Sequence, residues 1–319
     1  MFINLFLRIL SVFILVFLGG VARKTDVLDA ESTRRLSTAV KNFFYPALIF
    51  HTMFNNFTSG ELMGNWLLPA GAFMIMVTGY CWGLLASRFI LFKRSEEKSS
   101  FLFQCAINNY SFLPLPIVLM LWGGEGVAML IFSTLGSEIA VWTVGVFALS
   151  GNRFQRRSLK NLASVPMLSI VCAIAAVLAR DYFSGLEPAQ NGVIMQMGVS
   201  SMYALELLGG ATIPLALLVV GSRILVLESR HILSIKQVYT AALRLLLIPA
   251  TSALLLFLLP IAERMRLVLL VVAIMPSANA SVILSEAYGT DVDFAASSVL
   301  VTHLFSLFTI PLWLSFFLR

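Results

Sequence analysis

Two apolar segments of this 319-residue chain combine prolines with amide, hydroxyl and phenol side chains. The first segment, residues 106–117, contains Asn108, Asn109, Tyr110, Pro114 and Pro116. The second segment, residues 273–282, contains Pro276, Ser277, Asn279 and Ser281. Proline removes a backbone donor and clashes with the preceding turn. Both segments are therefore expected to interrupt a helix, and no regular helix is expected through Pro114–Pro116.

Such interruptions create sites for anions. A half-helix that starts at Pro116 or Pro276 directs its free N-terminal N–H groups into the membrane, and these groups favour an anion such as a carboxylate. The amides of Asn108, Asn109 and Asn279 are expected to donate hydrogen bonds to the same ligand, and the neighbouring hydroxyls and phenol to line its pocket. The alternative is two proline kinks whose asparagines bond between helices. Because the pattern occurs twice at matching positions, we predict a substrate site.

Five ionisable side chains fall within apolar segments, namely His51, Glu138, Glu206, Arg244 and His303. A charged residue costs roughly 2.5–3.5 kcal/mol at a bilayer centre, so each needs a partner or a task. Arg244 is expected either to hold a substrate carboxylate through its planar fork or to serve structurally. The structural role would be an ion pair with Glu138 or Glu206, or a side chain that reaches the membrane interface.

The two glutamates and two histidines are candidates for charge coupling. Glu138 or Glu206 could carry a coupling proton if burial raises its pKa. For Glu206 a fixed, hydrogen-bonded carboxylate is favoured, because Gly209 and Gly210 indicate close packing beside it. The two histidines could relay protons, although a histidine among aromatic residues is more often a polar packing residue.

The composition is that of a membrane protein. Apolar residues make up 59% and charged residues 12% of the chain, and the mean hydropathy is +0.91. A soluble domain has about 25% charged residues. Six long stretches carry no charge: residues 42–60, 62–87, 99–124, 161–179, 267–285 and 294–318. Four more stretches are long and apolar enough to span a membrane if each is allowed one internal charge, namely Arg8, Glu138, Glu206 or Arg244. We therefore predict an all-α membrane protein with ten transmembrane helices.

Basic residues predict the orientation. Sixteen of the 22 Lys and Arg residues fall in loops on one side, and these are Arg23, Lys24, Arg34, Arg35, Lys41, Arg88, Lys93, Arg94, Lys98, Arg153, Arg156, Arg157, Lys160, Arg223, Arg230 and Lys236. That side should be cytoplasmic, so both termini are expected to be non-cytoplasmic. Residues 1–21 are then an uncleaved anchor instead of a signal peptide. The net charge of +6 reflects topology and attraction to anionic lipid, and no nucleic-acid partner is predicted.

The chain divides into two halves. The short basic linker 152–160 separates a first five-helix repeat, residues 1–151, from a second repeat, residues 161–319. An odd number of spans per half requires the second half to insert upside down, which is the arithmetic of an inverted repeat. Residues 46–50 (PALIF) are echoed at residues 214–218 (PLALL), and the prolines of spans four and nine correspond.

Enzymatic chemistry is not predicted. Every aspartate lies in a predicted loop, which excludes the paired intramembrane aspartates of a protease, and no GxSxG or HExxH motif occurs. Cys81, Cys105 and Cys172 lie in apolar stretches and are expected to be small buried hydrophobic residues. No metal site and no cofactor is predicted beyond a coupling H⁺ or Na⁺.

The sequence resembles the auxin efflux carrier family, which includes plant PIN-type carriers and bacterial malate and malonate permeases. The resemblance covers nearly the whole chain. It is carried by residues 46–50, by Asn109 with Pro116, by residues 207–217 (LLGGATIPLAL) with Gly221-Ser222, by residues 275–279 (MPSAN) with Tyr288-Gly289 and Asp291, and by residues 310–312 (IPL). Two features depart from the family. Ser111 and Pro114 stand where the family has glycines, and the long cytoplasmic loop of the plant carriers is absent.

The resemblance implies ten helices in two inverted five-helix repeats, with broken helices 4 and 9 crossing at the substrate site. Helices 1, 2, 6 and 7 would form a scaffold, and helices 3–5 and 8–10 a transport domain that moves like an elevator. The cargo would be a small organic anion, such as malate, malonate or an auxin-like carboxylate. A homodimer and a bacterial inner-membrane location are also implied. A sodium-coupled carrier of the bile-acid symporter type is the alternative, and a sensor that has lost transport is a further one.

Overall fold

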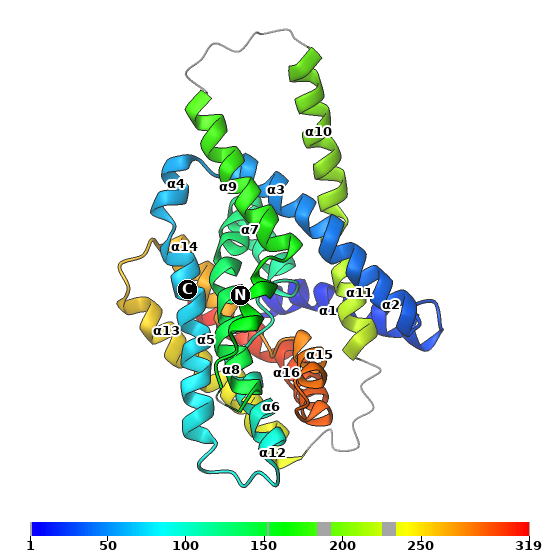
Figure 1. Cartoon of the computed structure of the whole chain (residues 1–319), viewed down its shortest axis with the longest axis vertical. Helices are drawn as coiled ribbons and strands as arrows, with labels where there is room; N and C mark the ends of the chain where they lie inside the picture. Colours follow the sequence, from blue (N-terminus) through cyan, green and yellow to red (C-terminus); the bar gives the residue numbers. More distant parts are fainter. Residues whose placement is uncertain (1, 152, 184–192, 225–233, 319) are drawn as a thin grey trace.

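The computed structural model describes residues 2–151, 153–183, 193–224 and 234–318. Every regular element within these ranges is a helix, joined by turns and one isolated β-bridge (Figure 1). The all-α prediction is therefore confirmed for the described part of the chain. Two residues used in the sequence predictions lie outside the described residues: Asn152, which begins the predicted linker, and Arg230, one of the sixteen basic residues.

The first half of the chain begins with a long helix, and several of the helices after it are short or interrupted. Its elements are α1 (Phe2–Lys24), α2 (Ala30–Ala39), the π-helical turn η1 (Val40–Phe44), α3 (Tyr45–Asn56), α4 (Ser59–Gly64), α5 (Leu67–Ala86), α6 (Ser95–Ala106), α7 (Pro114–Ala140), the π-helical turn η2 (Val141–Gly145) and α8 (Val146–Leu149). Side chains fix several starts. Asp29 caps α2 by accepting from the Ser32 amide at 2.7 Å, and Thr58 with Glu61 forms a capping box on α4.

The second half follows a similar plan. Its elements are the 3-10 helix η3 (Arg156–Leu162), α9 (Val165–Phe183), α10 (Val193–Gly210), α11 (Thr212–Ile224), α12 (Ile235–Ala242), the π-helical turn η4 (Leu243–Leu247), α13 (Ile248–Leu258), α14 (Glu263–Ala273), α15 (Ala280–Ala287) and α16 (Val292–Phe317). Gaps without helix separate α6 from α7 and α14 from α15, where the sequence predicts interruptions.

Seven helices of the described residues are long and apolar enough to cross a membrane. They span residues 5–24, 59–86, 114–149, 165–183, 196–224, 235–258 and 292–317. The other three predicted spans are short or interrupted. Residues 42–60 contain α3, and residues 99–124 and 267–285 each contain one of the two gaps.

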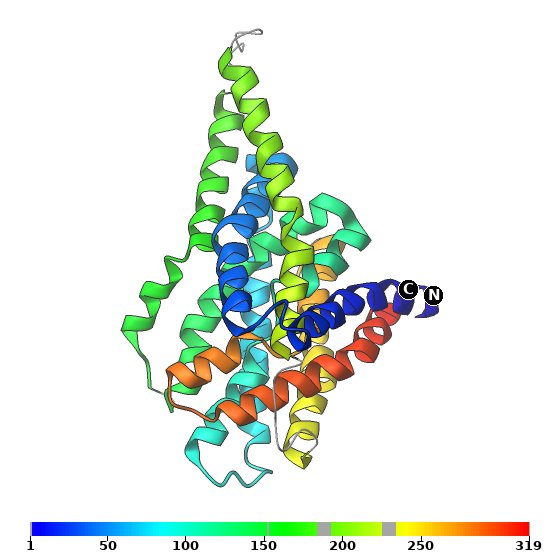
Figure 2. The same ribbon diagram turned by 90° about the vertical axis from the view of Figure 1, so that its right-hand side faces the viewer.

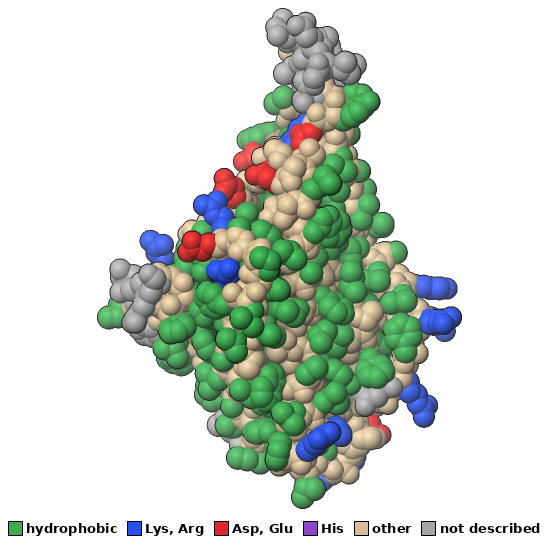
Figure 3. Space-filling model, turned by 90° about the vertical axis from the view of Figure 1, so that its left-hand side faces the viewer, with side chains coloured by type: hydrophobic (Ala, Val, Ile, Leu, Met, Phe, Trp, Pro, Cys, Tyr) green, Lys and Arg blue, Asp and Glu red, His purple; other side chains and the backbone are tan. Residues whose placement is uncertain are grey.

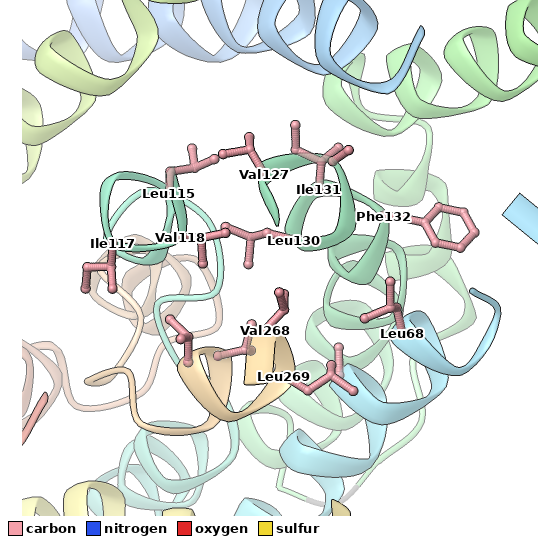
Figure 4. Close-up of a cluster of buried hydrophobic side chains, with 14 of the residues drawn as sticks. Leu68, Leu115, Ile117, Val118, Val127, Leu130, Ile131, Phe132, Val268 and Leu269 are labelled. Atoms are coloured by element: carbon pink, nitrogen blue, oxygen red, sulfur yellow. The ribbon is translucent and has the colours of Figure 1, made fainter. Parts of the chain in front are cut away.

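The helix over residues 114–149 is divided by a reversal of the chain. Gly123 has φ 61° and ψ −152°, a conformation open to glycine and costly for other residues. A Cβ at Gly126 would lie 3.0 Å from a methyl of Val118. Eight residues of continuous helix would separate these positions by about 12 Å. The two parts of α7 therefore fold back on each other, as Figure 4 shows for Leu115 and Val127.

The structure corrects the prediction for Pro114–Pro116. No regular helix was expected there, yet α7 begins at Pro114 and continues through Pro116. The reason is position. The first-turn N–H groups of a helix have no intrahelical partner, and the fixed φ of proline already matches the helix. Two prolines are therefore tolerated in the first turn, although both would disrupt a helix interior.

The core joins both halves of the chain. Val268 and Leu269 of α14 pack against Leu130 of α7 and Leu68 of α5 (Figure 4). Elsewhere α1 packs along α11, α3 packs against α9 and α10, and α16 packs against α1, α12 and α15. In Figures 1 and 2 the two chain ends lie close together at one side of the molecule, with α1 beside α16.

The outer surface is largely apolar. Figure 3 shows a face covered mainly by hydrophobic side chains, with most charged side chains toward its margins. Cys81 and Cys172 are exposed and only Cys105 is buried, so the expectation of three buried cysteines is wrong for two of them. A surface surrounded by lipid accepts a small apolar side chain as readily as a core does, and sequence alone does not separate the two.

Candidate functional site

The two gaps in the helices lie against each other. The amide of Asn109 donates to the carbonyl of Pro276 at 2.8 Å, and the amide of Ala278 donates to the carbonyl of Ile107 at 3.1 Å. These bonds make Asn108 and Ser277 an isolated antiparallel bridge. Segments more than 160 positions apart therefore meet without helix, and the unwound backbone of each satisfies that of the other.

The side chains at the bridge exchange hydrogen bonds in a symmetric way. Asn108 donates from Nδ2 to the carbonyl of Val272 at 2.5 Å, at the end of α14. Ser277 donates from Oγ to the carbonyl of Gln104 at 3.2 Å, at the end of α6. Each gap thus caps the C-terminal end of the opposite half-helix. Both residues are fully buried.

A cavity of about 280 Å³ opens beside this crossing. Five residues predicted for the site line it, namely Asn108, Asn109, Tyr110, Glu138 and Asn279. Its other described lining residues include Ser37, Lys41, Tyr45, Pro166, Ala216 and Arg223. One wall is therefore formed by the crossing with α7 and α15, and the facing wall by α2, η1, α3, α9 and α11.

Five other predicted residues do not line this cavity, and these are Pro114, Pro116, Pro276, Ser277 and Ser281. Half-helices were expected to start at Pro116 and Pro276, but the helices begin at Pro114 and Ala280. Pro276 lies outside any helix, and its carbonyl accepts the bridge bond from Asn109. Of the two helix starts, that of α15 at Asn279 and Ala280 borders the cavity.

Asn109 and Asn279, two of the three asparagines that line the cavity, differ in their partners. Asn109 is 6% exposed, and its Nδ2 lies 3.4 Å from Nε2 of His303. Nδ1 of His303 lies 2.8 Å from the carbonyl of Val299, an acceptor only, so Nδ1 carries the proton and Nε2 accepts from Asn109. Asn279 makes no such contact, and its Oδ1 is buried without a partner in the described structure. This oxygen is an acceptor and would need a donor from a ligand, whereas the Nδ2 group of Asn279 is the donor that an anion would use.

Glu138 is held by neutral donors at the edge of the cavity. Tyr110 donates from its hydroxyl to Oε1 at 2.8 Å, and Trp142 donates from Nε1 to Oε2 at 3.2 Å. This carboxylate is half-buried and has no basic partner among the residues described. Of the five ionisable candidates, Glu138 alone lines the cavity.

Comparison with known proteins agrees with the apolar helices and the crossing. A family model described as membrane transport protein matches residues 5–171 and 173–314. An uncharacterized transporter from Methanocaldococcus jannaschii is 27% identical over 309 residues, which cover 96% of this chain and 96% of that protein. The chain belongs to this membrane transport protein family. The resemblance to auxin efflux carriers is thereby confirmed, and the transporter is an integral, multi-pass membrane protein.

Arg244 of the transporter lies behind the crossing and not in the cavity. Its side chain is 0% exposed. Nη1 donates to the carbonyl of Cys105 at 3.0 Å and Nη2 to the carbonyl of Ala273 at 2.7 Å. Neither Glu138 nor Glu206 pairs with it among the described contacts. Arg244 is therefore bonded to two buried backbone carbonyls. It neither forms the expected ion pair with a glutamate nor reaches the surface.

His51 and Glu206 lie away from the cavity of the transporter. Nε2 of His51 is 3.9 Å from Oε2 of Glu206, whose side chain is 61% exposed. The close packing expected beside Glu206 is present at Gly209, where a Cβ would lie 2.9 Å from the backbone of Leu48 on α3. Close packing is absent at Gly210, where an added Cβ would have no neighbouring atom within 4 Å.

Two basic residues of the cavity wall were not predicted as site residues. Arg223, at the end of α11, is half-buried and donates from Nη2 to Oγ of Ser37 at 2.9 Å. Lys41, on η1, is exposed at the same opening. The sequence assigns both to cytoplasmic loops as topology signals. The available clue was that Arg223 directly follows Gly221-Ser222, a segment that carries the family resemblance.

A second cavity of about 460 Å³ continues from the first and shares Arg223, Asn279 and Ile283 with it. Arg23 and Arg34 also line it, together with Glu286. Hydrogen bonds from Arg34 and Arg35 lower the pKa of Glu31, so this exposed carboxylate stays ionised and partly neutralises Arg34. The second cavity is therefore lined by three arginines, Arg23, Arg34 and Arg223, and by one glutamate, Glu286.

Proposed function

We propose that this transporter carries a small organic anion across the membrane by alternating access. The carboxylate of the substrate would accept hydrogen bonds from the amides of Asn109 and Asn279, and a second anionic or polar group would meet Arg223. The chain would perform no covalent chemistry. The observation that carries the proposal is the cavity at the crossing, which is lined by Asn109, Asn279 and Arg223, and among the described residues Arg223 pairs with no carboxylate.

The charges around the cavity support an anion. Arg223 has a neutral hydroxyl as its described partner, so its charge is available to a ligand. A guanidinium binds carboxylates through a planar fork of donors, which makes arginine well suited to this cargo. Arg23 and Lys41 would raise the local concentration of anions at the opening. Glu138 would be the candidate carrier of a coupling proton.

Ten spans in two inverted repeats are part of this proposal. Counting α3 and the two interrupted helix pairs, α6 with the start of α7 and α14 with α15, adds three spans to the seven long helices. An even number of crossings leaves both termini on the same side, in agreement with the neighbouring chain ends in Figures 1 and 2. Sixteen basic residues on the predicted cytoplasmic side favour non-cytoplasmic termini. We propose a bacterial inner membrane as the location.

The two cavity walls suggest the moving parts. The wall of α2, η1, α3, α9 and α11 belongs to the proposed scaffold, helices 1, 2, 6 and 7. The wall of the crossing, α7 and α15 belongs to the proposed transport domain, helices 3–5 and 8–10. A substrate bound between them would move with the crossing, in an elevator-like cycle. With the basic residues at its mouth, the described cavity corresponds to an inward-facing state.

The test is uptake of labelled malate, malonate and indole-3-acetate by liposomes that contain the purified transporter. Wild type should take up at least one of them, and Asn279→Ala should lower uptake because the amide facing the cavity is lost. Asn65→Ala serves as the matched control, since Asn65 lies at the end of α4 and lines neither cavity. Equal uptake by Asn279→Ala and wild type would remove Asn279 from the site, and no uptake of any carboxylate would argue against an organic anion.

A further inference from the structure

The ends of α6 and α14 meet behind the cavity, and both are C-terminal ends. Each such end carries about half an elementary negative charge, because its last carbonyl groups have no intrahelical partner. Two of them at one place amount to about one negative charge. In a buried region this charge needs a cation close by.

Arg244 supplies that cation. Its guanidinium bonds one carbonyl from each end, Cys105 of α6 at 3.0 Å and Ala273 of α14 at 2.7 Å. Within the described residues no carboxylate pairs with it, and its Nε has no acceptor. A buried arginine without an acidic partner would be very costly, so the two helix ends must provide the compensating charge.

The surroundings of Arg244 favour this one task. It lies on η4, a π-helical turn inside the continuous helix α12–η4–α13, and such turns often mark functional positions. Gly79 of α5 covers the Cys105 carbonyl so closely that a Cβ there would fall on the oxygen. The guanidinium is therefore enclosed and lines neither cavity, which excludes direct contact with a substrate in the described state.

In transporters with discontinuous helices, the C-terminal ends of half-helices and the unwound carbonyls beside them often hold a sodium ion. Here the same kind of acceptor is already occupied by a side chain. We propose that Arg244 is a tethered cation that joins the ends of α6 and α14 in the place of a coupling sodium ion. The transport cycle therefore runs without sodium. The transport part of this inference rests on the proposed function, and the cation site itself does not.

The site is tested first by thermal stability in detergent, which requires no substrate. Arg244→Ala should lower the melting temperature by roughly 10 °C, because two buried carbonyl ends lose their cation. Millimolar methylguanidinium should restore part of that loss. Arg266→Ala is the matched control, since Arg266 also donates to two carbonyls, those of Leu256 and Ile261, but at a half-buried surface position. Methylguanidinium should not stabilise that variant.

A second variant keeps the test valid if Arg244→Ala does not fold. Arg244→Lys retains the charge but has no planar fork to bridge two carbonyls, so it should fold with a melting temperature between those of wild type and Arg244→Ala. An Arg244→Met variant as stable as wild type would overturn the tethered-cation role. So would methylguanidinium that stabilises the alanine variants of Arg244 and Arg266 equally.

Transport is tested with wild type in liposomes whose external sodium is replaced by potassium or choline. Uptake should be unchanged in all three salts. Uptake that is lost without sodium would overturn the coupling part of the inference. If wild type transports none of the carboxylates, the proposed function fails, while the stability and rescue measurements still decide the role of Arg244.

Discussion

Replacing Arg223 by glutamine tests the charge of the cavity most directly. Arg223 is half-buried on the wall that faces Asn279, and its described bond goes to the neutral Ser37. Glutamine keeps a donor of reduced length and removes the charge. The substitution should therefore weaken binding of an anion while leaving the packing of α11 against α1 in place.

The expected size follows from burial. A hydrogen bond to a charged group contributes about 1.5–3 kcal/mol, so loss of the guanidinium should raise Kd by roughly 10- to 150-fold. Lys41 lines the same cavity but is exposed, and an exposed ion pair contributes about 0–1 kcal/mol. Lys41→Gln should therefore raise Kd by at most about fivefold.

The assay is carboxylate binding to the purified protein, followed by the shift in melting temperature with ligand concentration. Measurements at low and high salt separate the two residues. The effect of Lys41→Gln should vanish at high salt because exposed charges are screened, whereas that of Arg223→Gln should persist. Arg157→Gln is the control, since this exposed arginine lies on η3 and lines neither cavity.

Two results would refute the reasoning. An Arg223→Gln variant with wild-type affinity would mean that the guanidinium does not meet the ligand. A larger loss for Lys41→Gln than for Arg223→Gln would mean that long-range attraction, and not contact in the cavity, governs binding.

Three further predictions concern the fold. Gly221→Ala should unfold or strongly destabilise the protein in a thermal melt, because its Cβ would fall on the backbone of α1, whereas Gly198→Ala, open on all sides, should stabilise α10 by up to about 1 kcal/mol. Gly123→Ala should cost about 1–3 kcal/mol by the same measurement, because the reversal inside α7 needs a positive φ. A membrane-permeant maleimide should label Cys172 and spare Cys105 unless the protein is denatured, as mass spectrometry would detect.

The two segments that contain the interruptions were predictable from sequence because the causes are local. Prolines remove backbone donors wherever they occur, and the asparagines beside them indicate buried polar backbone. Asn109 and Asn279 were identified on that basis and both line the cavity. The helix starts were misplaced, because whether a proline breaks or begins a helix depends on its position within the first turn.

The partners of the individual side chains depend on tertiary contacts and could not be predicted from sequence. Asn108 and Ser277 look like ligand donors in sequence, yet each caps a helix end from the opposite half of the chain. Arg244 lies within an apolar run, and Arg223 lies at the end of one. One is sealed between two helix ends and the other faces a cavity, because the approach of α6 and α14, and of α2 and α11, sets their surroundings. No local pattern contains those distances.

The bonds at the crossing bear on how the proposed elevator could move. Asn108, Ser277 and Arg244 tie α6, α14 and the helix α12–η4–α13 together through bonds that run in both directions between the two halves of the chain. Breaking any one of them would expose a buried carbonyl or guanidinium, so the crossing has to move as one rigid unit. On the cavity side, Tyr45 of α3 packs against Phe112 with ring centroids 5.5 Å apart, whereas the described side-chain hydrogen bonds of Ser222 and Arg223 on α11 go to α2 and do not reach the crossing. There Asn279 and Arg223 face each other from opposite walls, and a bound anion would supply the missing contact. Motion is therefore expected between the crossing and the wall of α2 and α11, and not within the crossing.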